Sequence, residues 1–170
     1  AGHLADLAHG EVRASNGVMN PQIRFGEDLM SRVSYAMMHA DGAAEMTRAV
    51  REALDGLLTG LAAQAGIGLD EILELALVGN PIMHHLLLGI DPVPLGSAPF
   101  ALAVERAVRT TAAEIGLAIR PGARVYVLPC IAGHVGADTA GVILADMPHR
   151  AELVRRVVDV GTNAELVRGN

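Results

Sequence analysis

The sequence contains no lysine, because all 13 of its basic side chains are arginine. This excludes three kinds of site that depend on a lysine: the phosphate-binding P-loop, the Schiff-base enzymes and the ATP-binding strand of protein kinases. With 170 residues, 51% of them apolar, the chain is long enough to bury about 68 to 70% of its unfolded surface. We therefore expect an ordinary globular domain that folds without disulfides or metals.

Aromatic residues are nearly absent, and the net charge is negative. There is no tryptophan, the aromatic residues are Phe25, Tyr35, Phe100 and Tyr126, and the net charge is −6. Nucleic-acid binding relies on a basic surface and on aromatic side chains that stack on bases. We therefore expect no nucleic acid partner.

Cysteine and long apolar runs are also scarce. The single Cys130 cannot form an internal disulfide or a four-cysteine iron–sulfur cluster, so a reducing cytoplasm is the expected compartment. The longest stretch without a charged residue, 75–90, contains Asn80 and Pro81 and is shorter than the about 18 apolar residues of a membrane span. We expect no membrane partner.

Apolar spacing and turn residues predict alternating strands and helices. The first predicted helix has Gly26 as its cap and runs to about His39. Further helices are predicted over 43–65, over a short segment that starts at Asp70, and over 81–89, 109–117 and 137–147. The predicted strands form a hairpin that turns at His9-Gly10, the buried runs 75–78 and 124–130, and a closing hairpin over 157–170. This alternation predicts an α/β domain with a mixed central sheet flanked by helices. Because a closing hairpin needs neighbours to cover it, we expect a piece of a longer protein.

The sharpest local motif is Asp159-Val160-Gly161-Thr162-Asn163, which follows an apolar strand. A carboxylate at a strand end can hold magnesium through its waters, and glycine lets a phosphate approach the backbone. Successive N–H groups in such a turn form an anion-binding concavity, to which the Thr162 hydroxyl and the Asn163 amide add donors. The motif suits a nucleoside triphosphate. An ordinary hairpin turn is the alternative, because it uses the same residue types.

Two further motifs join a predicted strand to a predicted helix. Gly79 and Asn80 stand where an α/β sheet opens a ligand crevice and where a helix N-terminus offers N–H groups to an anion. Gly136 and Asp138 stand at the next such junction, where a carboxylate can order a water molecule or a magnesium shell. Helix capping is the alternative in both cases. Asp138 is the candidate catalytic residue, and Gly79 and Asn80 are candidates for cofactor binding.

The histidines and the cysteine do not indicate a second site. His84 and His85 are adjacent and would point about 100° apart on a helix, which is poor geometry for two ligands of one metal. We expect them on a capped, partly buried helix and predict no metal-ligand set. Cys130 follows an apolar strand, so a buried thiol is favoured over a reactive thiolate.

Four blocks of sequence together resemble one family. They are NPQIRFGEDLMSR from Asn20, VGNPIMHHLLLGIDP from Val78, LPCIAGHVGADTAG from Leu128 and VDVGTNAELVRGN from Val158. In this order and at these separations they resemble the ATP-dependent reductive activators of corrinoid proteins. The four separate blocks extend over nearly the whole chain, which makes the resemblance far more specific than any single block.

This resemblance implies a fold and a division of the chain. The family is similar to actin, the heat-shock chaperone ATPases and the sugar kinases, in which two ribonuclease H-like lobes close on ATP. Residues 1–150 would form the first lobe without its first phosphate-binding turn, and residues 151–170 would be the opening hairpin of the second lobe. The helix over 136–145 would connect the lobes.

The resemblance also implies functional residues and partners. Asp159, Gly161, Thr162 and Asn163 would match the second phosphate-binding turn, and Asp138 the position that faces magnesium or water. The intact protein would use ATP and Mg²⁺, and electrons from an iron–sulfur domain, to reduce a cobalt(II) corrinoid protein to cobalt(I). The four cluster cysteines are absent from this chain, so the 170 residues alone are expected to be inactive. A homodimer is a candidate assembly.

Two other functions stay open at this point. A sugar or acyl kinase would share the fold, because the fold alone does not separate the two activities. A binding module without chemistry is the third reading, with Met37, Met38 and the proline-rich loop over 91–100 as contact surfaces.

Overall fold

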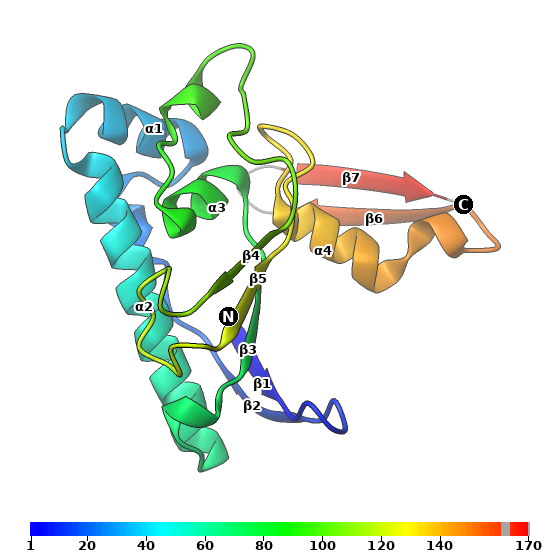
Figure 1. Cartoon of the computed structure of the whole chain (residues 1–170). Coiled ribbons are helices and arrows are strands. Elements are labelled where there is room, and N and C mark those ends of the chain that lie inside the picture. Colours follow the sequence, from blue (N-terminus) through cyan, green and yellow to red (C-terminus); the bar gives the residue numbers. More distant parts are fainter. Residues whose placement is uncertain (161–163, 170) are drawn as a thin grey trace.

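The chain runs through two strands, two helices, one strand, one helix, two strands, one helix and two final strands, and the described residues form three small sheets (Figure 1). The structure is a computed structural model and describes residues 1–160 and 164–169. The strands are β1 (Gly2–Ala5), β2 (Val12–Asn16), β3 (Glu74–Leu77), β4 (Val108–Thr111), β5 (Arg124–Val127), β6 (Arg155–Val160) and β7 (Ala164–Gly169). The helices are α1 (Leu29–Met38), α2 (Gly42–Ala65), α3 (Pro81–Leu88) and α4 (Ala137–Asp146).

The central sheet has three strands in the order β3-β5-β4. β3 runs parallel to β5, with Leu75 opposite Val125, and β4 runs antiparallel to β5, with Thr110 opposite Val125. β1 and β2 form an antiparallel hairpin, and β6 and β7 form another (Figure 1). The predicted mixed α/β class is therefore confirmed, although the strands are divided among three sheets.

One predicted helix is wrong. Apolar spacing predicts a helix over 109–117, whereas the structure has strand β4 followed by a turn. Val108, Thr110 and Thr111 are β-branched and fit a pleated strand better than a helix. The Glu114 carboxylate then accepts hydrogen bonds from the Thr110 hydroxyl (2.7 Å) and the Thr111 N–H (2.8 Å), which holds the chain in a turn.

The first helix begins later than predicted. α1 begins at Leu29 and is capped by Asp28, not by Gly26. The Asp28 carboxylate accepts a hydrogen bond from the Ser31 N–H (2.7 Å), and the Ser31 hydroxyl accepts one from the Asp28 N–H (3.1 Å), which makes a capping box. Gly26 instead ends the preceding 3-10 turn, Pro21–Phe25, with a φ of 151°.

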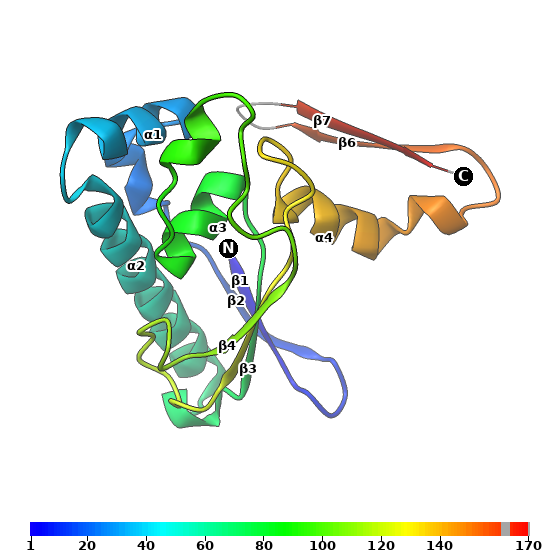
Figure 2. The same ribbon diagram turned by 45° about the horizontal axis from the view of Figure 1, so that its top comes forward.

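α2 is the longest helix and packs against most of the other elements (Figures 1 and 2). Its buried side chains recur at helical spacing and enter three apolar clusters. Leu58 packs with the central sheet, Met46 packs with α1 and α3, and Leu57 packs with the β1-β2 hairpin. The helix predicted over 43–65 is confirmed, and Gly66 ends it in the left-handed conformation (φ 69°).

Among the helices of the described residues, none has the length and apolar character that a membrane span needs.

α3 has the predicted cap. The Asn80 side chain accepts a hydrogen bond from the Met83 N–H (3.0 Å), and Pro81 occupies the first helical position. Gly89 ends the helix in the left-handed conformation (φ 73°). These signals are local, so the sequence could predict both ends of this helix.

His84 and His85 are buried on α3 and differ in their hydrogen bonds. The His85 Nδ1–H donates to the Pro81 carbonyl (2.8 Å) and Nε2 accepts from the Ala103 N–H (3.2 Å), which assigns a neutral ring. His84 is 2% exposed, and within the described part of the chain neither ring nitrogen has a hydrogen-bond partner. Burial, and to a smaller extent the neighbouring His85, lower the pKa of His84 from 6.5 to about 4.

Met46→Ala is expected to destabilise the fold strongly. Met46 is fully buried against Ile82 and Leu86, so its truncation leaves a cavity and lowers the free energy of unfolding by about 2 to 5 kcal/mol. Met38→Ala is the control, because Met38 is 75% exposed and its truncation should cost less than about 0.5 kcal/mol. Urea denaturation measures both variants, and equal midpoints would contradict the assigned core.

Stability is expected to fall as the pH drops from 6.5 towards 4, because His84 binds a proton in the unfolded chain but not in the folded one. Above pH 6.5 the lowered pKa of His84 does not change the free energy of unfolding. Below that pH it lowers the free energy of unfolding progressively, by up to about 3 kcal/mol. His84→Leu should remove this part of the pH dependence, whereas His9→Gln, at an exposed histidine, should retain it. Urea denaturation near pH 7.5 and pH 5 measures the difference. An unchanged pH dependence in His84→Leu would contradict a buried neutral ring.

Candidate functional site

The candidate side chains lie at the carboxyl ends of the parallel strands β3 and β5. Each strand leads through a loop into a helix, β3 through 78–80 into α3 and β5 through 128–136 into α4 (Figure 1). Ligand crevices of α/β sheets open at this edge. The structure brings Gly79, Asn80 and Asp138 together here, and we call this place the corner.

One backbone carbonyl holds the corner together. The Gly79 carbonyl accepts hydrogen bonds from the Ala137 N–H (2.9 Å) and the Asp138 N–H (3.4 Å). Gly136 allows this approach, because a Cβ there would lie 2.6 Å from the Asn80 Cα and 2.8 Å from the Gly79 oxygen. The β3–α3 loop is thereby fixed against the start of α4.

The two polar side chains of the corner each accept a hydrogen bond from an N–H group in the first turn of a helix. Asn80 accepts a hydrogen bond from the Met83 N–H, and one Asp138 carboxylate oxygen accepts one from the Thr139 N–H (2.9 Å). Among the described residues, the second Asp138 oxygen and the Asn80 amide nitrogen make no hydrogen bond. Asp138 is half-buried. These two groups are the ones that the corner can offer to a ligand.

Most of the backbone N–H groups at the N-termini of α3 and α4 already donate hydrogen bonds within the protein or are absent at proline. The first three N–H groups of α4 donate to Gly79 and Asp138. In α3, Pro81 has no N–H and the Met83 N–H is capped. A phosphate would therefore meet side chains at the corner, rather than the row of unused N–H groups that helix N-termini often present.

Asp138 is the residue of the corner that fits Mg²⁺. Mg²⁺ prefers oxygen ligands and is usually held by one or two carboxylates, with water and substrate phosphates completing its shell. The described residues contain no group of three or more side chains that could hold a metal. Asp138 would thus contribute one contact, directly or through water, and Asn80 could donate its amide to a phosphate oxygen.

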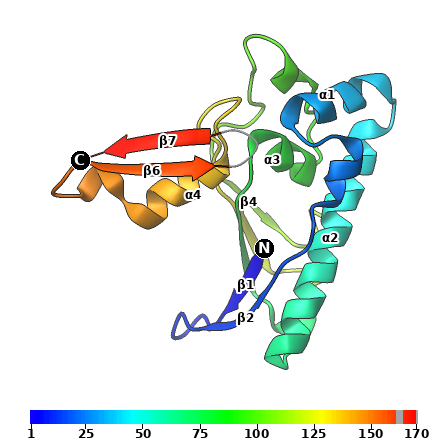
Figure 3. The ribbon, with the colours of Figure 1, turned by 180° about the vertical axis from the view of Figure 1, so that it is seen from behind.

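The predicted phosphate-binding motif lies on another element. Asp159 is exposed near the end of β6, opposite Glu165 in the hairpin. β6 runs from the far end of α4 back towards α3 (Figures 1 and 3). Gly161, Thr162 and Asn163 lie outside the described residues, so a phosphate-binding role for this motif stays a prediction.

Cys130 lies next to Ala137, at the start of α4, and is buried. It is 4% exposed, and burial raises the pKa of its thiol. A reactive thiolate needs a lowered pKa and access to solvent, so the prediction of a structural cysteine is confirmed.

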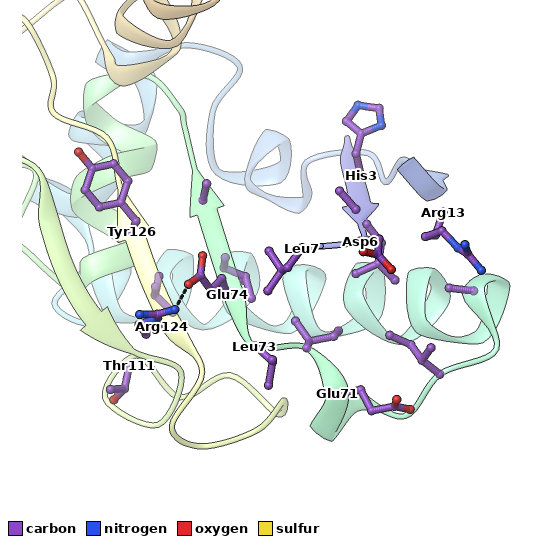
Figure 4. A pocket seen from close by; sticks show the side chains of 18 of the residues that line it. His3, Asp6, Leu7, Arg13, Glu71, Leu73, Glu74, Thr111, Arg124 and Tyr126 are labelled. Carbon is purple, nitrogen blue, oxygen red and sulfur yellow. Dashed lines mark hydrogen bonds and ion pairs between the residues drawn. The ribbon is translucent and has the colours of Figure 1, made fainter. Parts of the chain in front are cut away.

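Sequence reasoning missed a cavity of about 980 Å³ between β1 and β3 (Figure 4). Its lining includes His3, Asp6, Glu74, Arg109 and Tyr126. No sequence motif marks this cavity, because it arises where two short strands each have an unpaired edge.

Comparison with known proteins agrees with the resemblance of the four sequence blocks. Residues 1–151 match the family described as the RACo middle region. The corrinoid activation enzyme RamQ of Eubacterium limosum is 34% identical over 169 residues, which cover 99% of this chain and 28% of RamQ. A solved structure of a reductive activator for corrinoid, iron-sulfur protein matches with a TM-score of 0.95 and 32% identity, over 99% of this chain and 27% of that protein.

The chain spans little more than a quarter of each of these relatives. The predicted resemblance to reductive activators of corrinoid proteins is confirmed. Because the family match covers most of the described residues and the fold agrees over nearly all of them, the chain belongs to the RACo middle region family.

Proposed function

We propose that this chain forms one wall of the nucleotide cleft in an ATP-dependent activator that reduces a cobalt(II) corrinoid protein to cobalt(I). The observation that carries the proposal is the likeness, over 99% of the chain, to a corrinoid activation enzyme and to a reductive activator. The partner would be a corrinoid protein, and an iron–sulfur domain elsewhere in the longer protein would supply electrons.

The proposed reaction transfers one electron. The corrinoid substrate would gain this electron at cobalt(II), an iron–sulfur domain elsewhere in the longer protein would supply it, and no bond within this chain would form or break. ATP, when bound, supplies the free energy of its hydrolysis to this uphill step. Coupling requires that the nucleotide favour one arrangement of the two lobes over another. The share of this chain is to bind and orient the nucleotide at the corner.

Each residue of the corner has a proposed task. The free carboxylate oxygen of Asp138 orders an attacking water or the Mg²⁺ shell. The Asn80 amide donates to a phosphate oxygen. Gly79 keeps the β3–α3 loop against α4 and so sets the spacing between the two side chains.

We further propose that residues 1–150 form one ribonuclease H-like lobe and that residues 151–170 open the next. The family match ends at residue 151, and the β6-β7 hairpin contacts the 3-10 turn Pro148–Arg150. Three apolar side chains of the hairpin are exposed, and a second lobe would cover them: Val158, Val160 and Leu166. Asp159, Gly161, Thr162 and Asn163 would then supply the second phosphate contact.

One observation favours a second function, an interaction module without chemistry. Asn80 caps α3, Asp138 accepts the Thr139 N–H of α4, and the Gly79 carbonyl joins the two loops, and these contacts suffice for a structural joint. Exposed Met37 and Met38 would then serve as a contact surface. The kinase alternative has no comparable support.

Asp138→Asn in the longer, natural protein is expected to separate the two functions. The asparagine oxygen can still accept the Thr139 N–H, so this hydrogen bond is retained while the charge is lost. If Asp138 orders water or Mg²⁺, ATP-dependent reduction of the corrinoid protein slows by about 100-fold or more, with an unchanged unfolding midpoint. The cobalt(II) absorption band reports the rate.

Asp41→Asn is the control and should retain the rate, because Asp41 is exposed and its side chain makes no capping hydrogen bond at the start of α2. Calorimetry with Mg-ATP gives a second readout, in which Asp159→Ala weakens binding. Unchanged rate and nucleotide affinity in both Asp138→Asn and Asp159→Ala would support the interaction module instead.

A further inference from the structure

A third segment of the chain reaches the corner, and Met83 makes the contact. Asn20 begins the 3-10 turn Pro21–Phe25, and its amide nitrogen donates a weak hydrogen bond to the Met83 sulfur (3.8 Å). Met83 in turn lies against the corner. Its N–H donates to Asn80, and its Cβ lies 3.3 Å from the place that a Cβ on Gly79 would take. Asn20 therefore lies beside the corner, although Met83 is 63 residues away from it in the sequence.

The position of Asn20 is fixed by the turn that it begins. Pro21 occupies the first position of this turn, and the Asn20 side-chain oxygen accepts a hydrogen bond from the Gln22 N–H (3.0 Å). Gln22 is fully buried, and its side-chain amide donates to the Met46 carbonyl of α2 (3.3 Å). The turn is thereby anchored on the longest helix, and Asn20 is held in place with it.

The hydrogen bond from Gln22 also determines which way the Asn20 amide points. The oxygen has to face the Gln22 N–H, because an NH₂ group there would set two donors against each other. The nitrogen therefore points away from the turn and towards Met83. A thioether is a weak acceptor, so within the described part of the chain the amide N–H groups of Asn20 have no strong acceptor.

Asn80 has the same arrangement. Its oxygen accepts the Met83 N–H (3.0 Å), and among the described residues its nitrogen makes no hydrogen bond. Capping requires the oxygen alone, so serine or aspartate would cap about equally well. The caps therefore do not need the amide nitrogen of either asparagine. Both side chains are half-buried, which leaves part of each open to solvent.

Two amide donors beside one carboxylate suit a phosphate that carries Mg²⁺. A phosphate offers several acceptor oxygens, and its negative charge strengthens the hydrogen bonds that it accepts. Asp138 would repel a bare anion, but Mg²⁺ is commonly held between a carboxylate and substrate phosphates. The amides would then meet the phosphate oxygens while Asp138 meets the metal side.

We propose that Asn20, together with Asn80, binds a phosphate oxygen of the nucleotide. This inference rests on the proposed function, because it takes the corner as the place where the nucleotide binds. When the nucleotide binds, the Asn20 amide exchanges the Met83 sulfur for a phosphate oxygen, which is the stronger acceptor. The segment between β2 and α1 thus forms a third wall of the site. Asn20 is a binding residue and transfers no proton.

Two substitutions of Asn20 in the longer, natural protein test the proposal. Asn20→Ser and Asn20→Asp both keep an oxygen that can accept the Gln22 N–H, but both remove the amide donor. Calorimetry with Mg-ATP should show a Kd that is raised by at least about 10-fold in each variant, because a hydrogen bond to a charged acceptor is lost. The midpoint of urea unfolding should stay unchanged, because the cap is retained.

Asn16 is the matched control. It is exposed, and its side-chain oxygen likewise accepts a hydrogen bond from a nearby backbone N–H, that of Gly17 (2.8 Å). Asn16→Ser and Asn16→Asp make the same chemical changes away from the corner. Both should leave the Kd for Mg-ATP unchanged.

A second measurement needs no substitution of Asn20. In protein labelled with ¹³C at the methionine methyl groups, the Met83 resonance, assigned with Met83→Leu, should shift when Mg-ATP saturates the site, because Asn20 leaves the sulfur. The resonance of Met38, which is 75% exposed on α1, should not shift.

A raised Kd in both Asn20 variants, with unchanged urea midpoints and unchanged Asn16 controls, supports the proposal. If the protein without substitutions binds Mg-ATP and both Asn20 variants bind it equally tightly, the proposal is overturned while the proposed function stands. An unmoved Met83 resonance at saturating Mg-ATP overturns it in the same way. If the protein without substitutions does not bind Mg-ATP at all, the proposed function fails and this proposal fails with it.

Discussion

The parallel pairing of β3 with β5 is the constraint on which the rest of the structure depends. Parallel strands end at the same edge of a sheet, so the loops that follow them meet, and the Gly79 carbonyl can accept the N–H groups at the start of α4. The same pairing uses one edge of β3 and leaves the other facing β1. The corner therefore lies at the end of this strand pair, and the open edge of β3 runs along its side.

The elements that the sequence predicted correctly are those with local signals. Met46 and Leu57 fall on one face of α2 at helical spacing, Gly66 ends that helix, and Asn80 with Pro81 begins α3. β4 was not predictable in this way, because its spacing is also that of a helix and its partner strand follows only after a turn. The division of the strands into three sheets also depends on contacts between distant segments, which no local pattern encodes.

The candidate site was predictable in its residues but not in its hydrogen bonds. Glycine, asparagine and aspartate at strand-to-helix junctions indicated Gly79, Asn80 and Asp138, and parallel pairing brings them together. The donation of the α4 N–H groups to Gly79 depends on the distance between two loops far apart in the sequence. That contact changes the chemistry of the corner, since it leaves one carboxylate oxygen and one amide where the sequence suggested a row of N–H donors.

The open edges beside β1 and β3 bear on how such a protein is made. An unpaired strand edge is a template on which other chains can add, and it invites aggregation until it is covered. His3 and Glu74 are far apart in the sequence yet line one cavity, so a nascent chain exposes these edges over much of its synthesis. Recombinant pieces in which these edges stay open would form β-linked oligomers, and covering the edges would improve solubility more than replacing apolar residues elsewhere on the surface.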